Sequence, residues 1–293
     1  MLNWVFKMKI HPLLLIKSFF LLLAFLVTSA VFAETIQLTS AVNKKINANF
    51  YQGKGDANPV LMLHGFLQTN EFPTINRLAI SLHESGYTVL SPNLSLGLNN
   101  RKQSIDCEAI HTHSMDSDAK ELAQWIDWLH KKTGKPVTLI GHSAGGLVIL
   151  NYMENNHAKS INQTILISVS YYASGPAARE TIEHAQKARK AIEKGRNPLD
   201  KYALNYCETY PTYARDFLSY YNWDRDKTNA VILKHKKLIS LILGTEDKRI
   251  EKNWRQQLQK TTNKIMLIDG ANHFFDQTHE FDLIDAVETL LSN

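Results

Sequence analysis

The chain has 293 residues, 44% of them hydrophobic, and a formal net charge of +5. This length is enough for one large α/β domain or two small ones, each with a full core. Three lysines and no acidic residue lie in residues 1–33, so the rest of the chain carries a net charge of only about +2. That balance gives no support for nucleic acid or an anionic membrane as a partner, and no nucleic-acid-binding module is visible in the sequence.

Residues 1–33 are predicted to be an export signal. Lys7, Lys9 and Lys17 lie before or at the edge of the apolar run 19–27, and the small-residue stretch that follows ends in V-F-A at Ala33. This order is typical of a signal that is cleaved after the last alanine, and the apolar run is short for a membrane span. We therefore expect a periplasmic or secreted protein. An uncleaved N-terminal anchor is the alternative, and it would be the chain's one contact with a membrane.

From residue 34 onward, short apolar runs alternate with helical patterns. Two weakly alternating strands are expected at 35–40 and 45–52, before buried strands at 59–63, 87–91, 136–140, 164–168 and 238–243. Helices are expected at 75–85, 116–132, 144–154 and 281–291. Repeated alternation of this kind predicts an α/β fold with a mostly parallel sheet and helices on both of its faces.

The alternation stops between Tyr171 and Lys237, and this insertion is too long for an ordinary loop. Residues 178–194 have the pattern of a charged surface helix. Six aromatic residues, three or four apart, follow and suggest a helical stripe: Tyr202, Tyr206, Tyr210, Tyr213, Phe217 and Tyr220. The stripe either packs on the domain beneath it or also lines a pocket. We expect one domain over 34–293, with a cap formed by the insertion at about 171–237.

The segment LIGHSAGGLVIL, from Leu139 to Leu150, contains the pattern G-x-S-x-G centred on Ser143. Alone, this pattern occurs by chance in about one chain of this length in ten. Here Ser143 lies between an apolar strand pattern and an apolar helix pattern, which is the context of a nucleophile elbow. Gly141 and Gly145 leave room where the strand and helix backbones crowd together. We therefore predict that Ser143 is a nucleophile.

A serine nucleophile needs a histidine base, which in turn needs a carboxylate to orient it. The segment LISLILGTEDKRI places Glu246 and Asp247 directly after an apolar strand, and KIMLIDGANHFF places His273 after the next one. The order of serine, acid and histidine along the chain is the one found with a nucleophile elbow. His273 is therefore the predicted base, and one of the two acids is its partner.

Acyl transfer also needs donors for the oxyanion, usually two backbone N–H groups. One is expected from Ala144, the residue after the nucleophile. The other is expected from Phe66, because the strand at 59–63 runs into His64, Gly65 and Phe66, where the glycine lets the backbone turn into the site. The alternative for this stretch is an ordinary loop between a strand and a helix.

Together, GHSAGG, HGF, GTED and GANHFF resemble, in order and spacing, the serine hydrolases of the α/β-hydrolase superfamily, and the resemblance runs from Pro59 to the C-terminus. It implies an eight-stranded, mostly parallel sheet with a helical cap after the sixth strand, which is where the insertion falls. It also favours Asp247 as the acid, because its offset of three from Gly244 resembles the G-x-x-D turn of this fold. Glu246 is then expected to face solvent.

The loop after Ser91 departs from the family pattern. Many relatives carry a D-x-x-G-x-G stretch there, whereas this chain reads SPNLSLGLNNRKQ, so the substrates of better-known relatives do not transfer. The loop continues into CEAIHTHSMD, with His111 and His113. Two histidines without an evident third ligand do not predict a metal site. We expect them to line the entrance or to cap the following helix.

Cys107 and Cys207 are the only cysteines in the chain. In an exported protein such a pair can form a disulfide, which we predict here, with two buried thiols as the alternative. A bond between them would connect the loop before the helix at 116–132 to the insertion. It would thereby restrain the motion of the cap.

These residues together predict an exported serine hydrolase that works through an acyl-enzyme and needs no metal or organic cofactor. The preferred substrates are small carboxylic esters with an apolar group. Amide or peptide cleavage by the same residues is the alternative; an aminopeptidase would need an acid in the cap, for which Glu208, Asp216 and Asp224 are available. A binding protein that has lost the chemistry is a third possibility, which the complete residue set disfavours.

Overall fold

The computed structural model describes residues 33–155, 160–174, 177–262 and 264–292. Apart from Ala33, the predicted export signal lies outside the described residues and stays a prediction. Within the described ranges, no helix combines the length and the apolar character that crossing a membrane requires.

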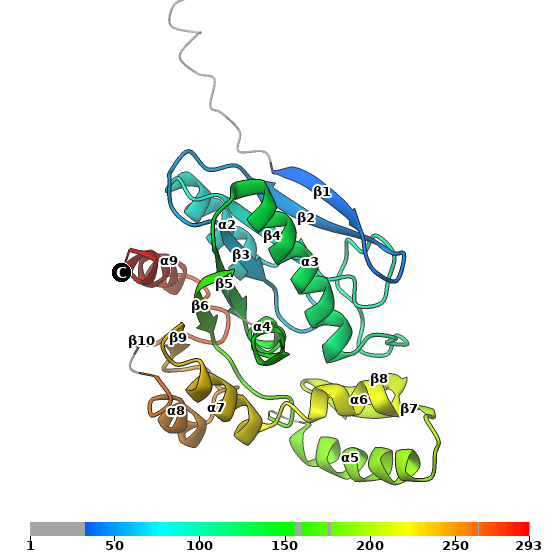
Figure 1. The fold of residues 1–293 in the computed structure, drawn as a ribbon. Coiled ribbons are helices and arrows are strands. Elements are labelled where there is room, and N and C mark those ends of the chain that lie inside the picture. Colours follow the sequence, from blue (N-terminus) through cyan, green and yellow to red (C-terminus); the bar gives the residue numbers. More distant parts are fainter. Residues whose placement is uncertain (1–32, 156–159, 175–176, 263, 293) are drawn as a thin grey trace, which may run out of the picture. The chain divides into compact units, whose positions relative to one another are not determined.

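An eight-stranded sheet organises residues 33–292, with strand order β1-β2-β4-β3-β5-β6-β9-β10 (Figure 1). The six strands from β4 to β10 in this order run parallel, and β2 is antiparallel to both of its neighbours. This confirms the predicted mostly parallel α/β sheet. The strands are β1 (Glu34–Thr39), β2 (Lys45–Tyr51), β3 (Val60–Leu63), β4 (Val89–Asn93), β5 (Val137–His142), β6 (Ile161–Ile167), β9 (Ile239–Gly244) and β10 (Ile265–Ile268).

Helices cover both faces of the sheet, as Figure 1 shows. In β3, Leu61 and Leu63 point into one apolar core, and Val60 and Met62 point into the other. Because successive side chains of a strand alternate between the two faces, a strand covered on both sides must be apolar throughout. One face carries α2 (Pro73–Glu84) and α9 (His279–Leu291); the other carries α3 (Met115–Thr133), α4 (Ala144–Asn155), α7 (Arg225–Lys234) and α8 (Lys252–Leu258).

The start of α3 follows from its sequence. The Ser114 hydroxyl accepts a hydrogen bond from the Ser117 N–H, and the Ser117 hydroxyl in turn accepts one from the Ser114 N–H, which makes a capping box. The helix ends at Gly134, whose φ of 70° is the left-handed conformation that favours glycine. Ser114 is therefore the cap of this helix, and the expectation that His111 or His113 caps it is wrong.

The inserted segment between β6 and β9 contains α5 (Ala178–Glu193), β7 (Leu199–Leu204), β8 (Cys207–Tyr213) and α6 (Ala214–Tyr221), followed by α7. The predicted helix at 178–194 is confirmed by α5. The predicted helical stripe is wrong over 199–213, because β7 and β8 form a hairpin in which Tyr202 pairs directly with Tyr210. Since α7 packs against α4 and α8, it belongs to the layer on the sheet. We call residues 171–223 the cap segment.

The cap segment is fastened to the loop that precedes α3. Cys107 and Cys207 form a disulfide with their Cα atoms 5.4 Å apart, as predicted. Beside it, the His111 N–H donates to the Pro211 carbonyl at 2.8 Å, and the Thr212 hydroxyl donates to the His111 carbonyl at 2.8 Å. The hairpin is thus held by a covalent bond and by backbone pairing at the same place.

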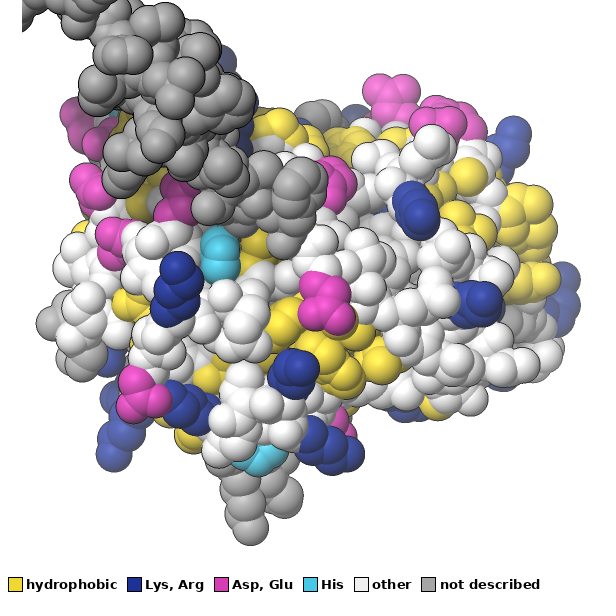
Figure 2. Space-filling model, turned by 90° about the horizontal axis from the view of Figure 1, so that it is seen from above, with side chains coloured by type: hydrophobic (Ala, Val, Ile, Leu, Met, Phe, Trp, Pro, Cys, Tyr) yellow, Lys and Arg dark blue, Asp and Glu magenta, His cyan; other side chains and the backbone are white. Residues whose placement is uncertain are grey.

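Charged side chains of both signs are interspersed on the face shown in Figure 2, among small hydrophobic patches. The basic excess of the chain is therefore not gathered into one block on this face.

Candidate active site

Ser143 lies on the sharp turn between β5, which ends at His142, and α4, which begins at Ala144. Its φ of 54° is in the left-handed region, which a residue other than glycine seldom adopts. A Cβ on Gly145 would lie 2.5 Å from the His64 carbonyl oxygen, and a Cβ on Gly141 would lie 2.7 Å from the Cα of Gly146. The two glycines of G-x-S-x-G are therefore required by close backbone approach.

The structure brings Ser143, His273 and Asp247 together from three separate strand ends. The His273 Nε2 lies 3.0 Å from the Ser143 Oγ, and the His273 Nδ1 lies 2.8 Å from the Asp247 Oδ2. All three residues are 5% exposed or less. The other oxygen of Asp247 accepts the N–H of Arg249 at 2.9 Å. This is the geometry in which a histidine can take a proton from a serine hydroxyl.

The electrostatics of this set favour an ionised acid. Burial raises the pKa of Asp247, but the hydrogen bond and charge of His273 and the N–H of Arg249 lower it more, so its pKa lies below the ordinary value. Asp247 is therefore a carboxylate at neutral pH. The neighbouring Glu246 is exposed, as expected for the acid that was not chosen.

Two further buried histidines hold the loops of the site, and the sequence analysis gave them no role. The His142 Nε2–H donates to the carbonyl of His273 at 2.9 Å. The His64 ring lies with Nδ1 2.9 Å from the Gly65 carbonyl, and its Nε2 accepts the N–H of Leu94 at 3.2 Å. Burial lowers the pKa of each histidine to about 3, so both are neutral. The sequence could have indicated a role for these histidines, because each lies inside a motif of the site: His64 in HGF and His142 in GHSAGG.

Phe66 and Ala144, the expected oxyanion donors, line one small cavity together with Gly65, Gly145 and Val148. Its volume of about 20 Å³ holds one or two water molecules. Among the hydrogen bonds between described residues, the backbone N–H groups of Phe66 and Ala144 have no acceptor. Both are thus available to an oxygen atom that develops negative charge.

A polar cluster at this cavity joins the cap segment to the start of α3, and His113, Asp118 and Tyr220 of the cluster line the cavity. The Tyr210 hydroxyl lies 3.2 Å from the His113 Nε2, and the Tyr220 hydroxyl lies 2.5 Å from the His113 Nδ1 and 2.5 Å from the Asp118 Oδ2. His111 and His113 are 1% and 3% exposed. Of the two histidines expected at the entrance, His113 lines this cavity, whereas His111 is not among its lining residues and stacks on Tyr210 with ring centres 3.9 Å apart. In the ranges that the structure describes, no group of three or more metal-ligating side chains occurs.

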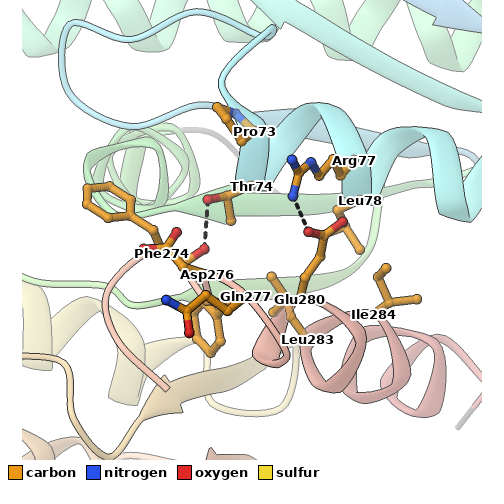
Figure 3. A pocket seen from close by; sticks show the side chains of 11 residues that line it. Pro73, Thr74, Arg77, Leu78, Phe274, Asp276, Gln277, Glu280, Leu283 and Ile284 are labelled. Carbon is orange, nitrogen blue, oxygen red and sulfur yellow. Dashed lines mark hydrogen bonds and ion pairs between the residues drawn. The ribbon is translucent and has the colours of Figure 1, made fainter. Parts of the chain in front are cut away.

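A second, larger cavity of about 250 Å³ lies beside the loop that follows His273 (Figure 3). There the Thr74 hydroxyl donates to the Phe274 carbonyl at 2.9 Å, and Arg77 of α2 forms an ion pair with Glu280 of α9. The hydrogen bond anchors the histidine loop to α2, and the ion pair joins α2 to α9. The cavity is lined by Pro73, Thr74, Arg77, Leu78, Phe274, Phe275, Asp276, Gln277, Glu280, Leu283 and Ile284.

The three acids considered for an ammonium site are in different situations. Asp224 is committed to the start of α7, because its side chain accepts the Lys227 N–H at 2.9 Å. Glu208 is exposed on β8. Asp216 lies half-buried on α6, where burial raises its pKa. The structure does not bring these three acids to Ser143 through any contact between described residues.

Comparisons with known proteins agree with this geometry. Residues 60–286 match the model of the alpha/beta hydrolase family. No curated protein matches the chain. Among solved structures, Est1E from Butyrivibrio proteoclasticus is 17% identical, with a TM-score of 0.61 over 88% of this chain and 98% of that one. GrgF from Penicillium sp. sh18 is 12% identical (TM-score 0.63; 89% and 99% covered), and the thioesterase domain from the curacin biosynthetic pathway is 16% identical (TM-score 0.58; 89% and 99% covered). At these identities the likeness shows the fold.

Proposed function

Because the chain belongs to the alpha/beta hydrolase family, we propose that it is an exported serine hydrolase that cleaves carboxylic esters through an acyl-enzyme. The observation that carries the proposal is the continuous contact from Ser143 through His273 to Asp247, at 3.0 and 2.8 Å. Both contacts are buried, so the charges that form during the reaction are poorly screened by water.

The reaction begins when Ser143 Oγ attacks the ester carbonyl carbon while its proton passes to Nε2 of His273. Asp247 accepts the Nδ1–H of His273 and stabilises the imidazolium that results. The N–H groups of Phe66 and Ala144 bind the oxyanion of the tetrahedral intermediate. Collapse breaks the bond to the alcohol oxygen, which takes the proton from His273, and leaves Ser143 acylated. Water then attacks the acyl carbon while His273 takes its proton, and collapse of the second intermediate releases the carboxylic acid and returns the proton to Ser143 Oγ.

The aromatic side chains around Phe66, of which Tyr172 also lines the cavity, support a small substrate with an apolar part. Phe66 is in edge or tilted contact with Tyr172, Tyr206 and Tyr210, with ring centres 5.6 to 5.7 Å apart. These rings limit the size of a group beside the oxyanion donors. Amide or peptide cleavage remains the alternative reaction, since the same three residues serve it.

A fluorophosphonate probe tests the nucleophile. We expect the wild-type protein to be labelled at Ser143, and the Ser143→Ala variant and heat-denatured wild type to remain unlabelled. A suitable matched control is Ser170→Ala, since Ser170 has the same 5% exposure as Ser143 but lies in the segment that follows β6. Equal labelling of the wild type and Ser143→Ala would contradict the proposal.

A substrate panel then tests the bond that is cleaved. We expect p-nitrophenyl acetate and butyrate to be hydrolysed faster than aminoacyl p-nitroanilides, and an acyl thioester belongs in the panel because a thioesterase domain shares the fold. Faster cleavage of the anilides would identify a peptidase. Export is tested separately, by N-terminal sequencing of the protein from cell fractions, with Glu34 as the expected first residue.

A further inference from the structure

Arg249 places a positive charge at the edge of the proposed catalytic residues. It lies two residues after Asp247, whose carboxylate accepts its backbone N–H at 2.9 Å. Its half-buried side chain extends between two aromatic rings, with the guanidinium carbon 5.4 Å from the centre of the Tyr206 ring and 5.0 Å from that of Phe274. The two rings come from the hairpin of the cap segment and from the loop that carries His273.

The guanidinium of Arg249 has no anionic partner in the part of the chain that the structure describes. No hydrogen bond or ion pair between described residues involves its side-chain N–H groups. The other arginines near the site differ: Arg101 donates to the carbonyls of Leu94 and Gln103, and Arg255 donates to that of Thr245. A guanidinium carries five N–H donors and an aromatic ring offers no oxygen acceptor, so the N–H groups of Arg249 remain free to bind one.

The position of Arg249 fits a substrate-binding role. The Phe274 ring centre is 5.1 Å from that of His273, so two steps of about 5 Å place the guanidinium no more than about 10 Å from the His273 ring. On the other side, the Tyr206 hydroxyl donates to the Phe66 carbonyl at 3.0 Å. Arg249 therefore lies between the loop of the histidine and the loop of the proposed oxyanion donor, within the length of a small ester.

We infer that Arg249 binds a carboxylate of the substrate, so that the preferred esters carry a carboxylate a few bonds from the carbonyl that is cleaved. A planar carboxylate can accept two parallel hydrogen bonds from a guanidinium, and such charge-assisted bonds are stronger than neutral ones. The nearest acid in the chain, Asp247, is engaged with His273 and with the backbone N–H of Arg249, so it does not pair with the guanidinium. This inference rests on the proposed ester hydrolysis and names its substrate class.

The test compares matched pairs of esters that differ only in one charge. One pair is mono-p-nitrophenyl glutarate and its methyl ester, which places the carboxylate on the acyl side. The other is 4-acetoxybenzoate and its methyl ester, which places it on the alcohol side. In the wild type we expect kcat/KM for the anionic ester to exceed that for the neutral one about tenfold or more in one pair, the effect of a hydrogen bond to a charged group.

The variants Arg249→Gln and Arg249→Lys measure the contribution of the guanidinium. We expect Arg249→Gln to lower the anionic-to-neutral ratio of kcat/KM about tenfold or more, and Arg249→Lys, which keeps the charge but loses the planar donors, to give an intermediate ratio. Lys248→Gln is the matched control, because Lys248 directly precedes Arg249 and its side chain is exposed. The variant removes a positive charge close to Arg249 without removing the guanidinium. It should leave the ratio as in the wild type. Thermal melting checks that each variant folds.

Three outcomes would overturn the inference. Equal rates for both members of each pair in the wild type would show that no carboxylate is recognised. An equal fall of the ratio in Lys248→Gln and Arg249→Gln would indicate a long-range field rather than a contact. A rise of kcat/KM for all esters in Arg249→Gln would show that Arg249 closes the site as a latch between Tyr206 and Phe274.

Binding separates this inference from the proposed reaction. Calorimetric titration of Ser143→Ala with both pairs of esters should give, in the pair for which the wild type shows the preference, a Kd for the anionic ester about tenfold or more lower than for its methyl ester. The difference should disappear when Arg249→Gln is added. Loss of hydrolysis with retained, Arg249-dependent binding would refute the hydrolase and keep the carboxylate site. Hydrolysis of neutral esters without any preference in binding would keep the hydrolase and refute the carboxylate site.

Discussion

Replacing Asp247 by asparagine should remove most of the activity without removing the shape of the site. The Arg249 N–H is 2.9 Å from one oxygen of Asp247, and the His273 Nδ1 is 2.8 Å from the other. In the Asp247→Asn variant the amide oxygen must take the place facing the Arg249 N–H, so the amide NH₂ faces His273. Nδ1 then becomes the acceptor and the proton moves to Nε2, which can no longer accept the proton of Ser143.

We expect kcat for p-nitrophenyl acetate to fall about 10⁴-fold at neutral pH, the loss found when a serine hydrolase histidine is held in the wrong tautomer. This corresponds to about 5 kcal/mol of transition-state stabilisation. Initial rates and the rate of fluorophosphonate labelling measure the effect, and the exposed neighbour Glu246→Gln is the matched control. A fall of less than tenfold in Asp247→Asn, or an equal fall in Glu246→Gln, would refute this account of the acid.

Three further predictions concern the scaffold. Gly145→Ala places a Cβ 2.5 Å from backbone and should lower kcat/KM at least about 100-fold, whereas Gly146→Ala, with its nearest neighbours at 3.4 Å, should stay near the wild type in the same assay. The double variant Cys107→Ser with Cys207→Ser opens a loop of 100 residues and should lose about 5 kcal/mol of stability, or roughly 10–20 °C in Tm, and a wild-type melt in reductant should fall equally. Burial raises the pKa of Glu121 to about 7, so its carboxyl binds a proton more tightly in the folded state than in the unfolded one. The free energy of unfolding should therefore fall as the pH rises from 4.5 to about 7 and should level off above that pH. The fall should be a few kcal/mol larger in the wild type than in Glu121→Gln. The same dependence of the unfolding free energy on pH in both proteins, measured by urea denaturation, would contradict this.

The residues around Ser143 could be anticipated because their signals are local. A buried parallel strand is apolar throughout, the turn after it must contain glycine where backbones touch, and the helix that follows starts at once. The same reasoning gave the strand ends at Asp247 and His273. Since the carboxyl ends of parallel strands lie at one edge of a sheet, three distant segments meet without any long-range information in the sequence.

The cap segment was predicted less well, because tertiary contacts decide its structure. Aromatic residues four apart fit a helix face, but Tyr202 and Tyr210 instead face each other across a hairpin. Pro211 was a local signal against a helix there, since proline has no N–H and clashes with the preceding turn. The surroundings of His113 and Arg249 carried no such signal. Their partners come from loops and helices far away in the sequence, so only the folded chain reveals them.

The disulfide has one consequence for how the protein responds to proteolysis. Cys107 and Cys207 close a covalent ring that includes Ser143, while Asp247 and His273 follow it in the chain. The exposed stretch 193–199 lies within that ring. A protease that cuts this stretch would therefore release no fragment until the disulfide is reduced. The nicked molecule would keep the serine and its partners as two polypeptides in one covalent assembly, separable on a reducing gel and inseparable on a non-reducing one.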